Sequence, residues 1–190
     1  MSAPFIVGFG GTTRPGSSGE KLVAAVLAAT EVLGARTQLF GGESLSALPH
    51  YAPEKPERTP EQIAFVNAIR AADAIVIGSP SYHGGISGLV KNALDLLEDT
   101  RADTRIYFDN CPVGLIVSAA GWQGGGVTLS AMRDMVCAMR GWPTPVGIAV
   151  NSVAQTVFAP DGSVADDSIR GAIAAQAAQL VAFARQPMAA

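Results

Sequence analysis

The sequence predicts an α/β fold in which helices cover both faces of a parallel sheet. Short runs rich in β-branched residues alternate with segments of helical periodicity, as they do in successive βαβ units. Two of these runs, Ala74–Gly78 and Val113–Val117, are entirely apolar, which is typical of parallel strands buried on both faces. With 190 residues and 48% hydrophobic side chains, residues 1–190 are expected to form one domain around one sizeable core.

Five strands are predicted, each followed by a connection to the next. They are expected at Phe5–Phe9, Thr37–Phe40, Ala74–Gly78, Val113–Val117 and Val146–Val150. The first and last helices are marked by apolar stripes at helical spacing: Leu22, Val23, Val26, Leu27 and Leu33 in the first, and Ile169, Ile173, Leu180 and Val181 in the last. These stripes would pack the helices onto the sheet.

Two further segments bear on the helical layers. Four prolines lie between Gly41 and Pro60, so this stretch is predicted to be a long surface loop without any regular element. The next helix is expected to begin there, with Thr59–Gln62 as its cap. A later helix carries Met132, Met135, Val136 and Met139; a methionine stripe at this spacing favours core filling over a cofactor contact.

Charge and composition exclude several functions. The formal net charge of −3 gives too little positive field to hold a nucleic acid. The first residues contain no basic segment followed by an apolar run, and no long apolar stretch indicates a membrane span. The two cysteines show no CxxC spacing and the two histidines are distant, so no metal site is expected and a reducing cytoplasm is the default location.

The first of three loops expected at the carboxyl edge of the sheet, Gly10–Gly19, has the composition of a phosphate site. Ligands of open α/β sheets bind at this edge, where the strand order reverses. Glycines let backbone N–H groups converge, hydroxyls add donors, and Arg14 can neutralise a phosphate at the N-terminus of the next helix. The loop is neither GxGxxG nor GxxxxGKS/T. A flexible loop with a solvated arginine is the alternative.

The second loop, Ser79–Gly88, follows the most apolar strand. Pro80 and small residues would bring backbone amides close to a flat ring whose edge offers several acceptors and one donor, as a flavin does. Tyr82 is expected beside such a ring, with ordinary half-buried packing as the alternative. For His83 an exposed loop position is favoured over an acid or base role, since a bound cofactor can perform the hydride chemistry itself.

The third loop, Ser118–Gly126, offers similar small residues after the fourth predicted strand. Ser118 and its neighbours could reach the polar edge of the same ring, and Trp122 could cover the ring or a nicotinamide. Alternatively, the glycine-rich loop is simply mobile and the tryptophan packs against a neighbouring subunit.

Two stretches together resemble the NADPH-dependent FMN reductase family: GTTRPGSS (Gly11–Ser18) and GSPSYHGGISGLVKNALD (Gly78–Asp95). The second stretch is highly specific, and the similarity runs from about Phe5 to Ser152. The resemblance implies a flavodoxin-like three-layer sandwich whose five-stranded parallel sheet has the order 2-1-3-4-5. It also implies FMN as cofactor and NADPH or NADH as hydride donor.

The resemblance assigns the FMN contacts residue by residue. The phosphate would bind to Thr12, Arg14, Ser17, Ser18 and Gly19, and the ring to Pro80, Ser81, Tyr82, His83, Gly84, Ser118, Ala119, Ala120, Gly121 and Trp122. Gly19 stands where relatives often carry Ser, Thr or Asn, so one side-chain contact to the phosphate is expected to be missing. Relatives often form homodimers or homotetramers, and some serve a monooxygenase partner. Their helix after the fourth strand often contains an inserted tyrosine, which residues 127–139 lack; a role in shuttling free flavin is therefore in doubt.

The favoured function is an NAD(P)H-dependent flavin reductase or oxidoreductase that uses FMN to pass hydride to free flavin, a quinone or another small acceptor. A flavodoxin-like electron carrier without nicotinamide-dependent activity is the main alternative. Carriers of that kind are usually more acidic and hold phosphate without a basic side chain, whereas this chain offers Arg14. A domain that has lost its cofactor is a third possibility.

Overall fold

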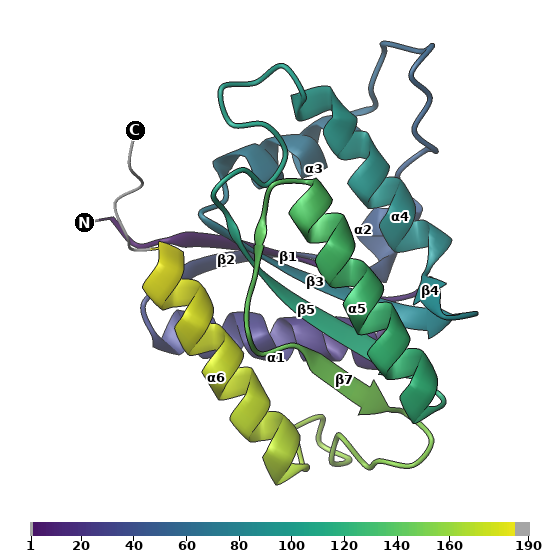
Figure 1. Ribbon diagram of the computed structural model, residues 1–190, viewed down its shortest axis with the longest axis vertical. Helices are drawn as coiled ribbons and strands as arrows, with labels where there is room; N and C mark the ends of the chain where they lie inside the picture. Colours follow the sequence, from purple (N-terminus) through teal and green to yellow (C-terminus); the bar gives the residue numbers. More distant parts are fainter. Residues whose placement is uncertain (1, 185–190) are drawn as a thin grey trace.

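A parallel sheet lies between two layers of helices in the computed structural model, which describes residues 2–184 (Figure 1). In spatial order, the strands are β2 (Arg36–Phe40), β1 (Phe5–Gly10), β3 (Ala74–Tyr82), β5 (Pro112–Ala119) and, sharing the far edge, β6 (Trp142–Pro143) and β7 (Ile148–Asn151). If β6 and β7 are counted as one interrupted strand, this is the predicted order 2-1-3-4-5. The flavodoxin-like architecture is therefore confirmed.

The helices divide between the two faces of the sheet. One face is covered by α1 (Ser18–Val32) and α6 (Asp167–Ala184); the other is covered by α2 (Gly42–Ser46), α3 (Pro60–Ala71), α4 (Gly88–Asp95) with the 3-10 helix η1 (Leu96–Thr100), and α5 (Trp122–Ala138). Successive strand residues point to opposite faces, so Ile6 and Val76 join the α1–α6 core while Val7 and Ile77 join the other. Met132 is buried in that second core, as the methionine stripe predicted.

The proline-rich segment is not wholly irregular, and the prediction of no regular element there was wrong. The short helix α2 occupies Gly42–Ser46, before the first of the four prolines. Beyond it, the chain is irregular up to Thr59, the N-cap of α3. Thr59 and Gln62 form a reciprocal capping box with Pro60 at the first helical position, as predicted.

The second predicted loop is partly a hairpin. β3 continues past Gly78 to Tyr82 and pairs antiparallel with β4 (Gly85–Ile86). The two residues at the tip, His83 and Gly84, have φ angles of 53° and 78°, the left-handed pair that suits a tight two-residue turn. Periodicity did not reveal this extension because serine, proline and glycine are poor strand formers.

The last strand, β7, begins at Ile148 and not at the predicted Val146, because the edge strand of the sheet is interrupted. Pro143 and Pro145 cannot donate to a ladder, and the chain leaves the sheet between β6 and β7. Val146 instead donates its N–H to Gln179 Oε1 at 3.1 Å and accepts from Gln176 Nε2 at 2.8 Å. Two glutamines of α6 thus replace the lost ladder bonds. Across residues 2–184, no helix is both long and apolar enough to span a membrane.

Candidate functional site

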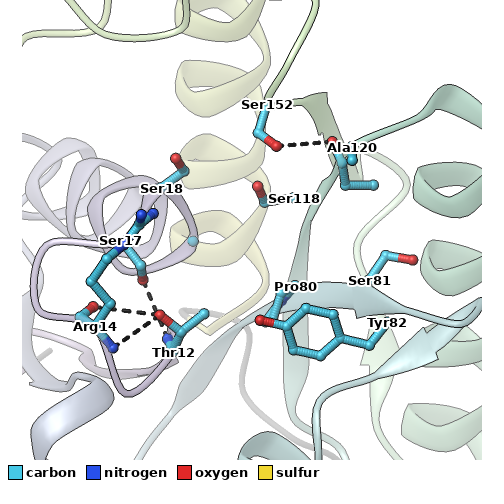
Figure 2. Close-up of a pocket in the computed structure, with 12 residues that line it drawn as sticks. Thr12, Arg14, Ser17, Ser18, Pro80, Ser81, Tyr82, Ser118, Ala120 and Ser152 are labelled. Carbon is cyan, nitrogen blue, oxygen red and sulfur yellow. Dashed lines mark hydrogen bonds between the residues drawn. The ribbon is translucent and has the colours of Figure 1, made fainter.

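A cavity of about 280 Å³ opens at the carboxyl ends of the strands (Figure 2). It lies where the strand order reverses between β1 and β3, the position at which open α/β sheets bind ligands. Four strand ends contribute to its lining: Thr12, Arg14, Ser17, Ser18 and Gly19 after β1, Pro80, Ser81 and Tyr82 in β3, Ser118, Ala119 and Ala120 at the end of β5, and Ser152 after β7. In Figure 2, the residues that follow β1 lie on one side of the cavity and Tyr82 and Ser81 on the other.

The N-terminus of α1 forms one end of the cavity and keeps backbone donors free. Ser17 is the N-cap, and its hydroxyl accepts from the N–H of Glu20 at 3.4 Å and from that of Thr12 at 3.3 Å. The first N–H groups of a helix have no partner within the helix. Because the cap takes the N–H of Glu20, those of Ser18 and Gly19 still point out of the helix end, where an anion is favoured.

Arg14 supplies a positive charge at the same end. Its backbone N–H donates to Thr12 Oγ1 at 3.2 Å, which fixes the turn. Its guanidinium makes no ion pair or hydrogen bond with any residue between 2 and 184. A free guanidinium beside free N–H groups is the donor set that a phosphate dianion requires.

The carboxylate of Glu20, in the first turn of α1, is directed away from the cavity. Its Oε2 accepts from the N–H of Gly42 at 2.8 Å, at the start of α2. Gly42 lies so close that a Cβ there would be 1.7 Å from the carbonyl oxygen of Thr12. The first loop is therefore supported from behind by α2, and the carboxylate that would repel a phosphate is bound elsewhere.

Hydroxyl groups hold the hairpin that forms the opposite wall. Ser81 Oγ donates to the carbonyl of Gly124 at 3.1 Å and lies 2.8 Å from the hydroxyl of Thr128 on α5. The buried Ser79 hydroxyl accepts from the N–H of Ser87 at 3.0 Å. Tyr82 is thereby held at the edge of the cavity by a strand that is fastened on both sides.

Ser152 also lines the cavity, although no sequence motif pointed to it. Its N–H and its hydroxyl both donate to the carbonyl of Ala119, at 2.8 and 3.1 Å, and so they fix the backbone at the end of β5. The residue follows the last predicted strand. Ligands of open α/β sheets bind beyond the carboxyl ends of the strands. If the residues after every predicted strand had been considered, and not only the glycine-rich loops, Ser152 would have been among the candidates.

Four of the predicted site residues do not line the cavity. His83 and Gly84 lie at the tip of the hairpin beyond Tyr82. Gly121 is the N-cap of α5 and Trp122 is its first residue, so the third loop is shorter than predicted and its tryptophan is exposed at the helix start. The other predicted residues all contribute to the cavity wall.

The lining matches the two ends of FMN. The end formed by Arg14 and the α1 N-terminus offers cationic and N–H donors for a phosphate. At the other end, the backbone of Pro80–Tyr82 and Ser118–Ala120 lies beside small side chains, so a ring edge can approach main-chain donors and acceptors. The residues present therefore fit this cofactor.

Residues 4–155 match the family described as NADPH-dependent FMN reductase. The chain belongs to this family. Membership makes the protein an oxidoreductase whose cofactor is FMN and whose hydride donor is NAD(P)H, in agreement with the resemblance noted in the sequence. The match covers β1 to β7 and every residue of the cavity.

Individual relatives agree with the family assignment. The chain is 28% identical over 134 residues to an NADPH azoreductase of Bacillus sp. (strain OY1-2), covering 68% of this chain and 70% of that one. It is 42% identical over 84 residues to an FMN-dependent NADPH-azoreductase of Staphylococcus aureus (strain USA300), covering 43% of this chain but only 39% of that enzyme.

A solved structure supports the fold over nearly the whole chain. The flavoenzyme NAD(P)H:(acceptor) oxidoreductase (FerB) from Paracoccus denitrificans superimposes with a TM-score of 0.77 at 20% identity. The match covers 96% of this chain and 97% of that one. At this identity, the similarity shows the flavodoxin-like architecture alone.

Proposed function

We propose that the chain, acting as one domain, binds FMN in the cavity and transfers electrons from NADPH or NADH to a small organic acceptor. The single observation that carries this proposal is that Arg14, which has no partner among residues 2–184, and the N-terminus of α1 line the same cavity as the ends of β3 and β5, in a member of this family. FMN accepts hydride from a reduced nicotinamide and passes two electrons on, so no acid or base side chain is required.

The residues of the chain position and shield the reactants. Arg14 and the N–H groups of Ser18 and Gly19 would hold the phosphate. The hairpin, fastened to α5 through Ser81, and the β5 end, fixed by Ser152, would set the plane of the ring. Each NAD(P)H supplies one hydride. With one proton from water, this hydride reduces a quinone to a hydroquinone. Reduction of an azo compound to two amines needs four electrons, and so two molecules of NAD(P)H and two protons.

Terminal reduction is favoured over delivery of free reduced flavin. The α5 residues 127–138 and the following Met139 include no tyrosine, the residue that flavin-shuttling relatives often insert there. Service to a monooxygenase partner is accordingly the less favoured variant of the proposal.

The test is anaerobic mixing of the FMN-loaded protein with NADPH and, separately, NADH. Loss of the flavin absorbance is expected with at least one of them. Steady-state oxidation of the nicotinamide with a quinone, an azo dye and free FMN, compared side by side, then identifies the acceptor. An absorbance that persists with both nucleotides would contradict the proposal and favour an electron carrier reduced by a protein partner.

We further propose a cytoplasmic location and assembly into a homodimer or homotetramer. Both Cys111 and Cys137 are free thiols, which suits a reducing compartment. The proposed assembly rests on the resemblance, because relatives in this family often form homodimers or homotetramers. Sedimentation of the purified protein at several concentrations would test the assembly.

A further inference from the structure

The loop that is proposed to hold the phosphate of FMN has a carboxylate close behind it. Glu20 lies in the first turn of α1, the helix whose N-terminus lines the cavity. A negative charge in the first turn stabilises a helix, but in α1 the same turn faces the proposed phosphate. The side chain of Glu20 is half-buried, so solvent screens its charge only in part.

Glycines of two connections lie against this carboxylate. A Cβ on Gly41 would be 2.9 Å from Glu20 Oε2, and a Cβ on Gly11 would be 3.3 Å from the same oxygen. The Cβ position of Gly11 is also 3.2 Å from Ser17 Oγ, the hydroxyl that caps α1. Gly11 is thus within contact range of both groups, so the negative charge lies close behind the helix end.

The hydrogen bond to Gly42 positions the carboxylate but does not cancel its charge. Oε2 accepts from the N–H of Gly42 at 2.8 Å, and no cation pairs with Glu20 among residues 2–184. The adjacent Lys21 lies over the ring of Phe158, with its Nζ 5.6 Å from the ring centroid. A negative charge therefore remains behind the loop.

This charge opposes the binding of a phosphate through space. A phosphate monoester carries about 1.5 to 2 negative charges at pH 7, and Arg14 and the helix N-terminus attract it. Repulsion between charges extends over a Debye length of about 8 Å at physiological ionic strength, which is longer than the roughly 5 Å between adjacent backbone segments. The oxidised flavin ring is uncharged, so the repulsion acts on the phosphate.

We propose, on the basis of the proposed function, that Glu20 is a specificity-determining residue that lowers the affinity of the cavity for phosphorylated flavin. It weakens the binding of FMN and leaves the binding of riboflavin, which lacks the phosphate, unchanged. Glu20 makes two separable contributions, because its charge opposes the phosphate while its hydrogen bond to Gly42 supports the loop that binds the phosphate.

The test is Glu20→Gln, which removes the charge and keeps an oxygen that can accept from Gly42. We expect the Kd for FMN to fall roughly three- to tenfold, the size of the repulsion between such charges near a protein surface. The Kd for riboflavin should stay at the wild-type value. Titration of the flavin-free protein, followed by flavin fluorescence, measures both constants without turnover.

Glu31→Gln is the matched control on the same helix. The Glu31 carboxylate also accepts a hydrogen bond, from the hydroxyl of Thr37, but it lies near the other end of α1. This variant loses the same charge from the chain and should leave both Kd values unchanged. Glu20→Ala also lacks the acceptor for Gly42, so it should bind FMN less tightly than Glu20→Gln does.

Salt separates an effect of charge from a change in the shape of the loop. The difference in FMN affinity between wild type and Glu20→Gln should shrink when the ionic strength rises from about 0.05 M to about 0.5 M, because salt screens the repulsion. A difference caused by altered packing would persist.

The outcomes separate failure of this inference from failure of the proposed function. The inference is overturned by a Kd for FMN in Glu20→Gln that equals or exceeds the wild-type value, by a gain that riboflavin shares, or by a gain that persists at high salt. In these cases the FMN-loaded wild type would still lose its flavin absorbance with NADPH or NADH, and the proposed function would stand. Failure of the wild type to bind FMN would instead defeat the proposed function itself.

Discussion

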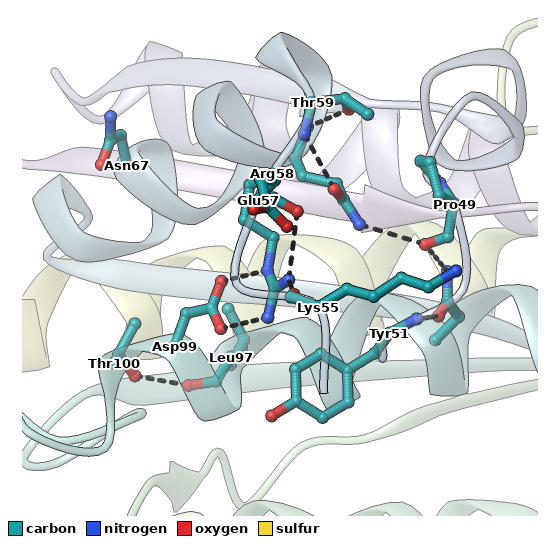
Figure 3. A network of polar contacts seen from close by, with 12 residues as sticks. Pro49, Tyr51, Lys55, Glu57, Arg58, Thr59, Asn67, Leu97, Asp99 and Thr100 are labelled. Carbon is teal, nitrogen blue, oxygen red and sulfur yellow. Dashed lines mark hydrogen bonds and ion pairs between the residues drawn. The ribbon is translucent and has the colours of Figure 1, made fainter. Parts of the chain in front are cut away.

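Arg14 and Arg58 both lie on irregular connections, but their guanidinium groups differ in whether they have a partner. Arg58 donates to both carboxylate oxygens of Asp99, at 2.7 and 2.9 Å, and lies over the ring of Tyr51 (Figure 3). Hydrogen bonding to Asp99 raises the pKa of the Arg58 guanidinium. Arg14 has no such partner among residues 2–184. A guanidinium that is paired with a carboxylate is structural, whereas one without a partner can receive an anion.

The two connections are also held in place by different contacts. The proline-rich segment binds its Pro49 carbonyl to the side chains of Gln62 and Asn92, at 3.2 and 3.1 Å. The first loop is instead supported by Gly42 from outside, and short-range hydrogen bonds among Thr12, Arg14 and Ser17 fix its backbone while the Arg14 guanidinium has no partner among residues 2–184. The first three of the following predictions test this difference and a fourth concerns the two cysteines; they run from the largest expected effect to the smallest.

Gly42→Ala should be the most damaging change. The added Cβ would overlap the carbonyl oxygen of Thr12 at 1.7 Å, so either α2 or the first loop must move. We expect about 3 kcal/mol or more to be lost from the free energy of unfolding, as in other overpacked sites, together with weaker FMN binding. Urea denaturation followed by circular dichroism measures the first effect.

Gly88→Ala is the control for that substitution. A Cβ at Gly88 meets nothing within 4 Å, and alanine is favoured in a helix, so stability should be unchanged or slightly increased. Wild-type stability of Gly42→Ala would show that α2 does not support the loop.

Arg14→Ala should weaken FMN binding without affecting folding. The loss of a charged phosphate contact is expected to cost about 1.5–3 kcal/mol, roughly a ten- to 150-fold rise in Kd. Quenching of FMN fluorescence on titration measures the Kd, and denaturation of the FMN-free protein should match wild type. Arg101→Ala, at an exposed position after η1, is the control. An unchanged Kd would place the phosphate elsewhere.

Arg58→Ala should show the opposite pattern. Removal of its paired contacts with Asp99 is expected to lower the free energy of unfolding by about 1–2 kcal/mol, while the Kd for FMN stays the same. A double-mutant cycle with Asp99→Asn would assign the loss to this pair. Weaker FMN binding in Arg58→Ala would contradict the separation of roles between the two connections.

The smallest effect is expected from the two cysteines, because Cys111 is buried and Cys137 is exposed. Burial raises the pKa of the Cys111 thiol to about 12, so above pH 9 an unfolded chain releases its proton while the folded chain retains it. Stability should therefore fall as the pH rises through this window, by about 1 kcal/mol at pH 10.

Cys111→Ala should abolish that part of the pH dependence. In the native protein, iodoacetamide should label the exposed Cys137 and spare Cys111, which mass spectrometry of the digested protein can establish. Rapid labelling of Cys111 would show that its surroundings open readily.

The sequence alone determined the layers of the fold and the kind of chemistry at the site. Strand positions followed from apolar runs, helix faces from their spacing, and the content of the strand-end loops from their composition, because each of these is a local property of neighbouring residues. Pro80, Ser81, Ser118 and Arg14 were selected in this way, and the structure places all four on the cavity wall.

The tertiary structure decided which residues meet. Ser152 contacts Ala119, Glu20 binds Gly42, and Ser81 pairs with Thr128. These residues are far apart in the sequence, so no local sequence pattern predicts the contacts. The same holds for the end of β3, where pairing with β4 turns an expected loop into a hairpin and carries His83 beyond the cavity. Long-range contacts depend on how the elements pack, and packing is fixed only when the whole chain has folded.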